Sequence, residues 1–272
     1  MVDRLRPEPG LLLRGEVADL RHRLNQISTK DLRSHLAAAE GRLDAGYVYG
    51  GQVVYTSSDT FSKADYPGLR AVRVKCQGAG GGGGGVAATG AGERAVSAGG
   101  NGGGYAEKFI LVDDLSDNET VTVGAGGSGG PAGNNAGSSG GDSSFGSHCV
   151  GEGGVGGSGG FLSNVPTFTG ESGSSTLAGG TGDLVIRGGG AGVGFSFGTG
   201  IRQGHNSQGG GSHLGAATNV IRQGGNTTGS NGQGSDGIPY GGGASGLISR
   251  DNALATAGKK GAPGIVLVEL YF

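Results

Sequence analysis

Two histidines, His205 and His213, are the residues whose type and spacing come nearest to a metal site. They stand eight residues apart in a glycine-rich stretch, and no cysteine or carboxylate lies between them. Zinc sites in proteins combine three or four histidine, cysteine or carboxylate ligands in characteristic spacings. The sequence therefore predicts no metal site, and we expect no cofactor.

Carboxylates that could form a catalytic pair are isolated from one another. Glycoside cleavage needs two carboxylates that face each other across the bond to be broken, and no nucleophile-elbow motif is present that would suggest acyl transfer. These patterns indicate that the protein is not an enzyme. The carboxylates that stand singly among glycines are Asp142, Glu152, Glu171, Asp183 and Asp236.

Residues 72–85, VRVKCQGAGGGGGG, raise the question of a phosphate-binding loop. A dinucleotide-binding fingerprint requires a helix after its glycines, and a P-loop requires a Lys-Ser/Thr pair. Neither follows this run. One calcium-binding nonapeptide pattern, NGQGSDGIP, occurs at 231–239, but such repeats bind calcium only in tandem. Nucleotide and calcium binding are both disfavoured.

Composition and charge exclude further classes. The net charge is −2 without a basic block, so no nucleic-acid partner is expected. No apolar run reaches the roughly 18 residues of a membrane span or forms a signal-peptide core. We expect a soluble protein made in the cytoplasm. Cys76 continues the inward parity of Val72 and Val74, which predicts a buried free thiol.

The first 46 residues predict helices. Leucine-type residues spaced 4, 3, 4 and 3 form a short coiled-coil seam, and STKD at 28–31 resembles a capping box before a second amphipathic helix. Two heptads are too few for a stable coiled coil alone. We expect this seam to oligomerise chains that are also held together elsewhere; the alternative is a helical hairpin that folds onto its own domain. The seam consists of Leu13, Val17, Leu20, Leu24 and Ile27.

Residues 47–272 predict a mainly β domain. Alternating apolar residues indicate strands near 53–55 and 72–76 and over 105–114, 119–126 and 183–190, with a last strand in GIVLVELYF at the end of the sequence. The last strand must pair with an upstream strand and so enclose the glycine runs between. Enclosed glycine backbone can satisfy its hydrogen bonds as polyglycine-II-type helices, because only glycine tolerates the close approach of neighbouring chains. Glycine-rich loops on an ordinary sandwich and disorder are the alternatives.

The ordered set VYTSSDTFSKADYPGLRAVRVKCQGAGGGGGG, GGGYAEKFILVDD, ETVTVGAGGSGG, GGDSSFGS and GKKGAPGIVLVELYF resembles the glycine-rich domain of bacteriophage tail-fibre and tail-tip proteins, over residues 53–272. More loosely, the domain is similar to receptor-binding adhesins at long tail-fibre tips. The resemblance implies a virion tail protein in which a rigid glycine-rich tip carries segments that touch the host surface. Its own N-terminal helices depart from those adhesins and favour a short fibre that forms a homotrimer and attaches to other tail or baseplate proteins.

Under this interpretation, the non-strand excursions 86–101, 130–148, 161–177 and 195–240 are candidates for receptor contact. In the last excursion, IRQG occurs at 201–204 and 221–224, which suggests two similar edges that display the residues between them. A bacterial surface glycan or outer-membrane protein is the expected receptor. The alternative is a purely structural tail-tip component in which the glycine domain is a spacer and Phe195 and Phe197 plug its end. The receptor-contact candidates are His205, Asn206, Gln208, His213, Asn219, Phe195, Phe197 and Tyr240.

Overall fold

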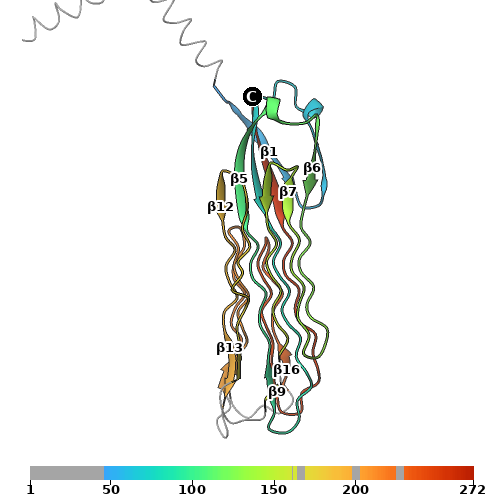
Figure 1. Cartoon of the computed structure of the whole chain (residues 1–272), viewed down its shortest axis with the longest axis vertical. Helices are drawn as coiled ribbons and strands as arrows, with labels where there is room; N and C mark the ends of the chain where they lie inside the picture. Colours follow the sequence, from blue (N-terminus) through green and yellow to red (C-terminus); the bar gives the residue numbers. More distant parts are fainter. Residues whose placement is uncertain (1–45, 161, 164–168, 198–202, 225–229) are drawn as a thin grey trace, which may run out of the picture. The chain divides into compact units, whose positions relative to one another are not determined.

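The computed structural model describes residues 46–160, 162–163, 169–197, 203–224 and 230–272. The chain divides into two compact units, Met1–Val48 and Tyr49–Phe272. The predicted helices and the seam from Leu13 to Ile27 lie outside the described residues. In the second unit, a β-sandwich, an array of glycine-rich segments and a pair of distal sheets follow one another along one direction (Figure 1).

The first sheet of the sandwich contains five antiparallel strands, and the last strand of the chain lies inside it. β18 pairs with β1 on one side and with β3 on the other, so the prediction that the final strand pairs with upstream strands is confirmed. The order is β1 (Tyr49–Tyr55), β18 (Ile265–Tyr271), β3 (Ala71–Gln77), β5 (Tyr105–Leu111) and β12 (Leu184–Ile186).

The second sheet packs against the inner face of the first. Its order is β11 (Gly180–Thr181), β8 (Cys149–Gly151), β7 (Ser143–Phe145), β6 (Asn118–Thr122) and β2 (Asp59–Ser62), and two 3-10 turns, η1 (Lys63–Asp65) and η2 (Val112–Asp114), flank it. Alternate residues of β3, β5 and β18 meet Phe61, Phe145 and Cys149 in one apolar core. Cys76 is fully buried there as a free thiol, as predicted.

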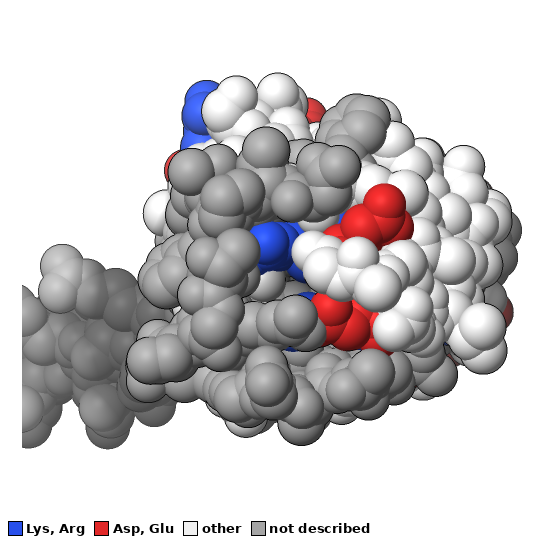
Figure 2. All heavy atoms as spheres, turned by 90° about the horizontal axis from the view of Figure 1, so that it is seen from below, with Lys and Arg blue, Asp and Glu red and all other residues white. Residues whose placement is uncertain are grey.

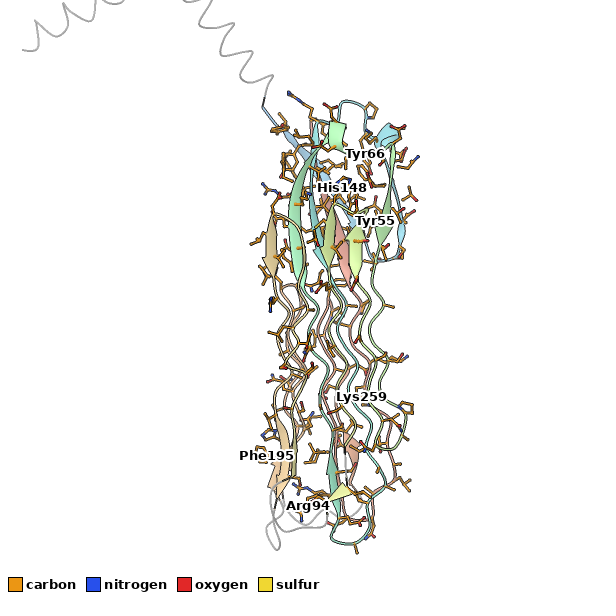
Figure 3. All side chains as sticks on the ribbon, in the orientation of Figure 1. Tyr55, Tyr66, Arg94, His148, Phe195 and Lys259 are labelled. Atoms are coloured by element: carbon orange, nitrogen blue, oxygen red, sulfur yellow. The ribbon has the colours of Figure 1, made fainter. Side chains whose placement is uncertain are left out.

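Two four-stranded sheets lie at the opposite end of this unit. One has the order β16 (Ser230–Gln233), β17 (Ile248–Arg250), β4 (Arg94–Val96) and β9 (Leu162–Ser163); the other has β10 (Thr169–Glu171), β13 (Gly194–Phe197), β14 (Gln203–His205) and β15 (Arg222–Gly224). We call these the distal sheets. Figure 3 shows Phe195 and Arg94 near this end, whereas Tyr55, Tyr66 and His148 lie in the sandwich.

Between the two ends, glycine-rich segments run side by side, and we call them the glycine array (78–86, 98–104, 124–133, 135–141, 152–160, 188–192, 207–211, 241–246 and 256–264). Segment 78–86 donates its N–H groups to three antiparallel neighbours in strict rotation, so each neighbour is reached at every third residue. The rotation runs from Gly78 to Gly104, Ala79 to Gly141, Gly80 to Ala262, Gly81 to Asn101, Gly82 to Ser138, Gly83 to Lys259, Gly84 to Ala98, Gly85 to Asn135 and Val86 to Thr256.

The carbonyls of the same segment accept from three other neighbours. Gly157 N–H donates to Gly82 O, Gly130 N–H to Gly83 O and Ala244 N–H to Gly81 O, at 2.8–3.0 Å. Segment 78–86 is therefore surrounded by six segments. In the described residues, the glycine runs are neither disordered nor surface loops, because their backbone groups are paired with one another.

Close approach of backbones explains why the array consists of glycine. A Cβ added to Gly82 would lie 2.1 Å from the carbonyl oxygen of Ser128, and one added to Gly84 would lie 1.9 Å from that of Ser158. Real Cβ atoms do not approach backbone oxygens so closely, so a side chain would force neighbouring segments apart. Within the described part of the chain, no α-helix occurs and no helix could cross a membrane.

Candidate functional site

The distal end lies far from the point where the N-terminal residues join the domain. β1 begins at Tyr49, and β18 ends beside it, with Tyr271 opposite Tyr49. Both lie in the sandwich. The central segment of the array covers eight residue steps from Gly78 to Val86, which corresponds to about 25 Å at the rise of a threefold extended helix. The distal sheets are thus held away from this junction.

Two distal turns are joined to each other by hydrogen bonds. The Asp251 carboxylate accepts from Gly92 N–H at 2.8 Å, and Asp251 N–H donates to Glu93 O at 3.0 Å. Asp251 and Asn252 have φ values of 35° and 54°, in the left-handed region that non-glycine residues rarely enter. Leu254, two residues later, is 70% exposed. This pair of turns is an ordered surface, because each turn supports the other.

Two arginines are buried beside these turns. Arg94 and Arg250 are directly opposite each other on β4 and β17, and they are 6% and 2% exposed. Figure 2, which looks at this end, shows basic atoms deep in the surface with acidic atoms beside them. Like charges directly opposite across strands are destabilising unless other charges compensate. Sequence reasoning missed this pair, since RAV and ISR carry no signal that the two segments meet.

Of the predicted receptor-contact residues, Phe195 and His205 come together. They are cross-strand partners on β13 and β14, with ring centroids 4.0 Å apart at 67°. Both side chains are half-buried. The His205 ring nitrogen Nδ1 lies 2.9 Å from Asn206 O. Phe197 follows on β13, where its backbone pairs with Gln203. Because these strands belong to a distal sheet, this part of the predicted set lies at the end remote from the junction.

Asn206 is not displayed, contrary to the expectation from the sequence. It is fully buried; its Nδ2 donates to Gly246 O at 3.1 Å, and its Oδ1 accepts from Ile221 N–H at 2.6 Å. The residues that follow it belong to the array, since Gly210 N–H donates to Gly100 O. Segment 206–212 is therefore scaffold. An amide in a glycine-rich run gives no sign in the sequence of whether it is displayed or buried.

Gln208 and Asn219 differ from Asn206 in exposure. Gln208 is half-buried beside Gly192, whose N–H donates to Gln208 O at 2.8 Å. Asn219 is exposed on the returning segment. Receptor contact by either residue stays a prediction, and Asn219 is the more accessible of the two.

His213 and Tyr240 lie beside the sandwich and not at the distal end. The His213 ring is 4.4 Å from the Tyr105 ring, and Leu214 N–H donates to Gln77 Oε1 at 3.2 Å. The carbonyl of Tyr240 accepts from the Ser212 hydroxyl. Eight residues of extended backbone separate His213 from His205 by about 25 Å, so the two histidines cannot share a ligand. No cluster of three potential metal ligands occurs among the residues that the structure describes.

The second halves of the two IRQG copies form neighbouring strand edges. β14 and β15 pair antiparallel, with Gln203 opposite Gly224 and His205 opposite Arg222. The two similar edges expected around 205–220 are thus adjacent strands. The chain between them does not form a display loop, because it extends along the array as far as the sandwich and returns.

The isolated carboxylates have a structural use that the sequence did not reveal. Four of the five accept a hydrogen bond from a backbone N–H, so each of these four satisfies a donor at the border of the array or of a sheet. The pairs are Asp142 with Gly153, Glu152 with Gly179, Asp183 with Phe109 and Asp236 with Lys260, at 2.7–3.0 Å. The fifth carboxylate, Glu171, is placed in β10 by its backbone alone.

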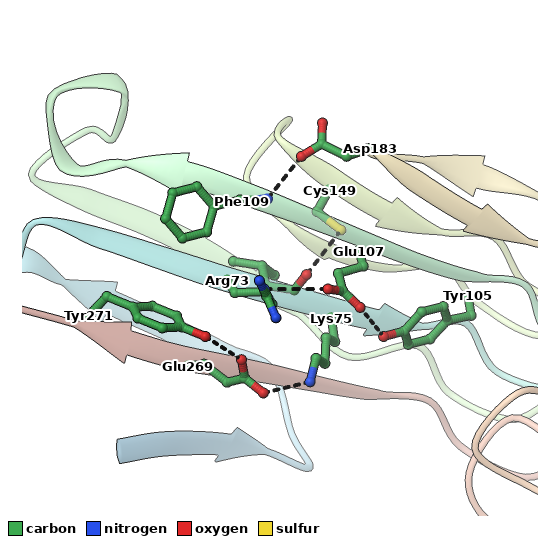
Figure 4. A network of polar contacts seen from close by, with 10 residues as sticks. Arg73, Lys75, Tyr105, Glu107, Phe109, Cys149, Asp183, Glu269 and Tyr271 are labelled. Carbon is green, nitrogen blue, oxygen red and sulfur yellow. Dashed lines mark hydrogen bonds and ion pairs between the residues drawn. The ribbon is translucent and has the colours of Figure 1, made fainter. Parts of the chain in front are cut away.

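The outer face of the first sheet carries a network of paired charges (Figure 4). Lys75 Nζ lies 2.5 Å from Glu269 Oε1, and the Tyr271 hydroxyl donates to Glu269 Oε2 at 3.0 Å. Burial by itself would raise the pKa of Glu269, but these two hydrogen bonds and the charges of Lys75 and Arg73 hold it below its usual value. Arg73 Nε lies 3.5 Å from Glu107 Oε1. The face is therefore polar at its centre without a net charge from these four groups.

Fold and surface together define a mainly β domain whose interior is a hydrogen-bonded glycine array. A family model described as a glycine-rich domain matches residues 56–271. This match covers most of the chain, and the chain belongs to that family. No curated protein matches the sequence.

Proposed function

We propose that this chain is a bacteriophage tail-fibre protein that recognises the host cell surface through the distal end of its glycine-rich domain. Residues 1–46 would attach it to other tail or baseplate proteins and hold a homotrimer. The observation that carries the proposal is the separation of the two ends: the junction with residues 1–48 lies in the sandwich, and the ordered distal turns lie beyond the array.

In this proposal the array is a bundle of polyglycine-II-type helices that acts as a rigid spacer. The three-residue rotation of hydrogen bonds and the six neighbours of segment 78–86 support this assignment. Its backbone is fixed by bonds on all sides, and its glycines have no side chains to rearrange. Such a spacer would hold the distal turns in one orientation toward a bacterial surface.

The candidate contact groups at that end suit a glycan or a loop of an outer-membrane protein. The Phe195–His205 ring pair offers aromatic surface, and the turn at 251–254 offers Asn252 and the exposed Leu254. Recognition is expected to reside at such turns, because loops on a rigid scaffold commonly carry binding function.

Binding of labelled full-length protein to a panel of bacterial strains tests the proposal. We compare Leu254→Asp at the distal turn with Ser128→Asp, an exposed position on the array. If the distal end recognises the cells, Leu254→Asp should weaken binding to a susceptible strain about tenfold or more, equivalent to about 1.4 kcal/mol. Ser128→Asp should bind like the unmodified protein. Equal binding by both variants would place recognition away from this turn.

The second candidate is a purely structural tail-tip component with the array as spacer or plug. The observation in its favour is that Asn206 is used inside the fold and that His213 and Tyr240 lie beside the sandwich. Under this alternative, the full-length protein binds none of the strains, whereas particles that lack it fail to assemble a complete tail tip.

A further inference from the structure

Segment 124–133, on the outside of the glycine array, follows a pattern with a period of three residues. One row of its residues is buried and consists of glycine, and the next row is exposed and carries side chains. The hydrogen bonds of the array also repeat every third residue, so each row keeps to one side of the segment. Glycine therefore faces the array, and side chains face away from it. The buried row is Gly124, Gly127 and Gly130, and the exposed row is Ala125, Ser128 and Pro131.

Two other outer segments, 152–160 and 256–264, present outward rows of the same kind. The central segment 78–86 differs from them, because it is surrounded by six segments and every residue from 80 to 85 is glycine. Side chains thus recur on the sides of the segments that face solvent. The rows are Glu152, Val155 and Ser158 in one segment and Ala257, Lys260 and Pro263 in the other; Val155 is half-buried and the rest are exposed.

Contacts inside the array show what a single Cβ does to a neighbouring segment. A Cβ added to Gly129 would lie 2.1 Å from the carbonyl oxygen of Gly258, on the adjacent segment 256–264. No segment can stay so close once that atom is present. The outward row of 124–133 already carries a Cβ at each position, so a further segment cannot pack on that side at the spacing used inside the array.

An array without such rows would be prone to add further segments. Segment 78–86 shows that a glycine segment can hydrogen-bond to neighbours all around it. Backbone groups left open at the edge of a β-sheet pair with other chains unless they are protected, and the same reasoning applies to the sides of this array. A second copy of this chain would supply glycine segments of matching length. Pro131 and Pro263 add to the protection, because proline has no N–H to donate.

We infer that the outward rows of side chains end the array and keep copies of this protein from joining through it. The rows of 124–133 and 256–264 form one protected face, because these segments are directly hydrogen-bonded: Gly258 N–H donates to Gly130 O and Gly261 N–H to Gly127 O, both at 2.8 Å. This role does not depend on the proposed function. It concerns the sides of the array, whereas recognition is proposed for the distal end.

Removing the Cβ atoms from this face of the full-length protein tests the inference. The glycine variant changes all six outward residues of the two rows to glycine. The matched alanine variant changes the four that are not already alanine to alanine, so it loses the same charge and the same prolines but keeps every Cβ. The glycine variant combines Ala125→Gly, Ser128→Gly, Pro131→Gly, Ala257→Gly, Lys260→Gly and Pro263→Gly, and the alanine variant combines Ser128→Ala, Pro131→Ala, Lys260→Ala and Pro263→Ala.

Sedimentation velocity over a tenfold range of concentration measures the association. The mean mass of the glycine variant should rise by about twofold or more across this range, because association follows mass action. The alanine variant should sediment like the unmodified protein at every concentration. A folded glycine variant that also sediments like the unmodified protein would overturn the inference. Association of both variants would overturn it too, because charge or proline, and not the Cβ atoms, would then keep the copies apart.

Thermal unfolding shows whether each variant is folded, since added glycine widens the unfolded ensemble. If the glycine variant does not fold, a smaller pair of variants decides by the same criteria. That pair is Ser128→Gly/Lys260→Gly and Ser128→Ala/Lys260→Ala, which leave both prolines in place.

Discussion

Replacing one glycine at the centre of the array should strongly destabilise the domain, whereas the same change at its border should not. We choose Gly82→Ala, since a Cβ at this position would lie 2.1 Å from Ser128 O and 2.9 Å from Gly127 O. The matched control is Gly190→Ala, where the nearest atom to an added Cβ is Leu177 Cδ2 at 3.4 Å.

The magnitude follows from the hydrogen bonds that the displaced segment makes. To relieve the clash, residues 124–133 must move away from 78–86 by about 1 Å. That movement breaks the bonds from Gly127 N–H to Gly80 O and from Gly130 N–H to Gly83 O, both 2.9 Å long. Each of the two broken bonds leaves at least one buried group unpaired, at a cost of about 1–3 kcal/mol per group, so the variant should lose about 2–6 kcal/mol or more. The middle of this estimated loss is about 4 kcal/mol. It is a large part of the total free energy of unfolding, because domains are typically stable by about 5–15 kcal/mol.

Equilibrium unfolding in guanidinium, followed by tyrosine fluorescence because the chain has no tryptophan, measures the difference. A loss of about 4 kcal/mol corresponds to a melting temperature lower by about 8–16 °C for a domain of this size. Gly190→Ala should be neutral or more stable by about 0.4–1 kcal/mol, because alanine restricts the unfolded chain. If the two variants unfold within about 1 kcal/mol of each other, close backbone packing at Gly82 does not stabilise the domain.

Three further outcomes are expected. Asn206→Ala should lower the free energy of unfolding by about 2–4 kcal/mol, because the buried Gly246 O and the half-buried Ile221 N–H lose their hydrogen-bond partner; no change in denaturant unfolding would mean that the Asn206 amide is solvated. Burial alone would raise the pKa of Glu119, but the Ser116 N–H and His148 hold it below its usual value. Stability from Glu119 should therefore be present above about pH 4.3, its unfolded pKa, and lost as the pH falls through the lower folded pKa. Glu119→Gln should remove that acid-dependent part of the unfolding curve, and an unchanged pH profile would contradict this assignment. Cys76→Ser should cost about 1–3 kcal/mol by burying a poorly paired hydroxyl, and the native thiol should not react with an aromatic disulfide reagent until the protein unfolds.

Local patterns were sufficient for the three central strands of the first sheet. Alternation in VRVKC, YAEKFIL and IVLVELY predicts strands that the structure places in β3, β5 and β18, and the inward parity of Cys76 follows from the two-residue period of a strand. Such periodicity depends only on neighbours in the chain. The described part of residues 47–272 contains strands and 3-10 turns but no α-helix, in agreement with the predicted mainly β domain.

Which side chains share a surface depended on the tertiary structure. His205 and His213 are close in sequence, yet extended backbone carries one to the distal sheets and the other to Tyr105 in the sandwich. Arg94 and Arg250 are far apart in sequence and lie opposite each other. The glycine content of the sequence determines that the segments can pack closely, because no side chain keeps their backbones apart. It does not indicate which segments are neighbours, because a glycine run has no side-chain period. Only the tertiary structure decides which segments are neighbours, because the backbone hydrogen bonds that satisfy their N–H and C=O groups join segments that are distant in sequence.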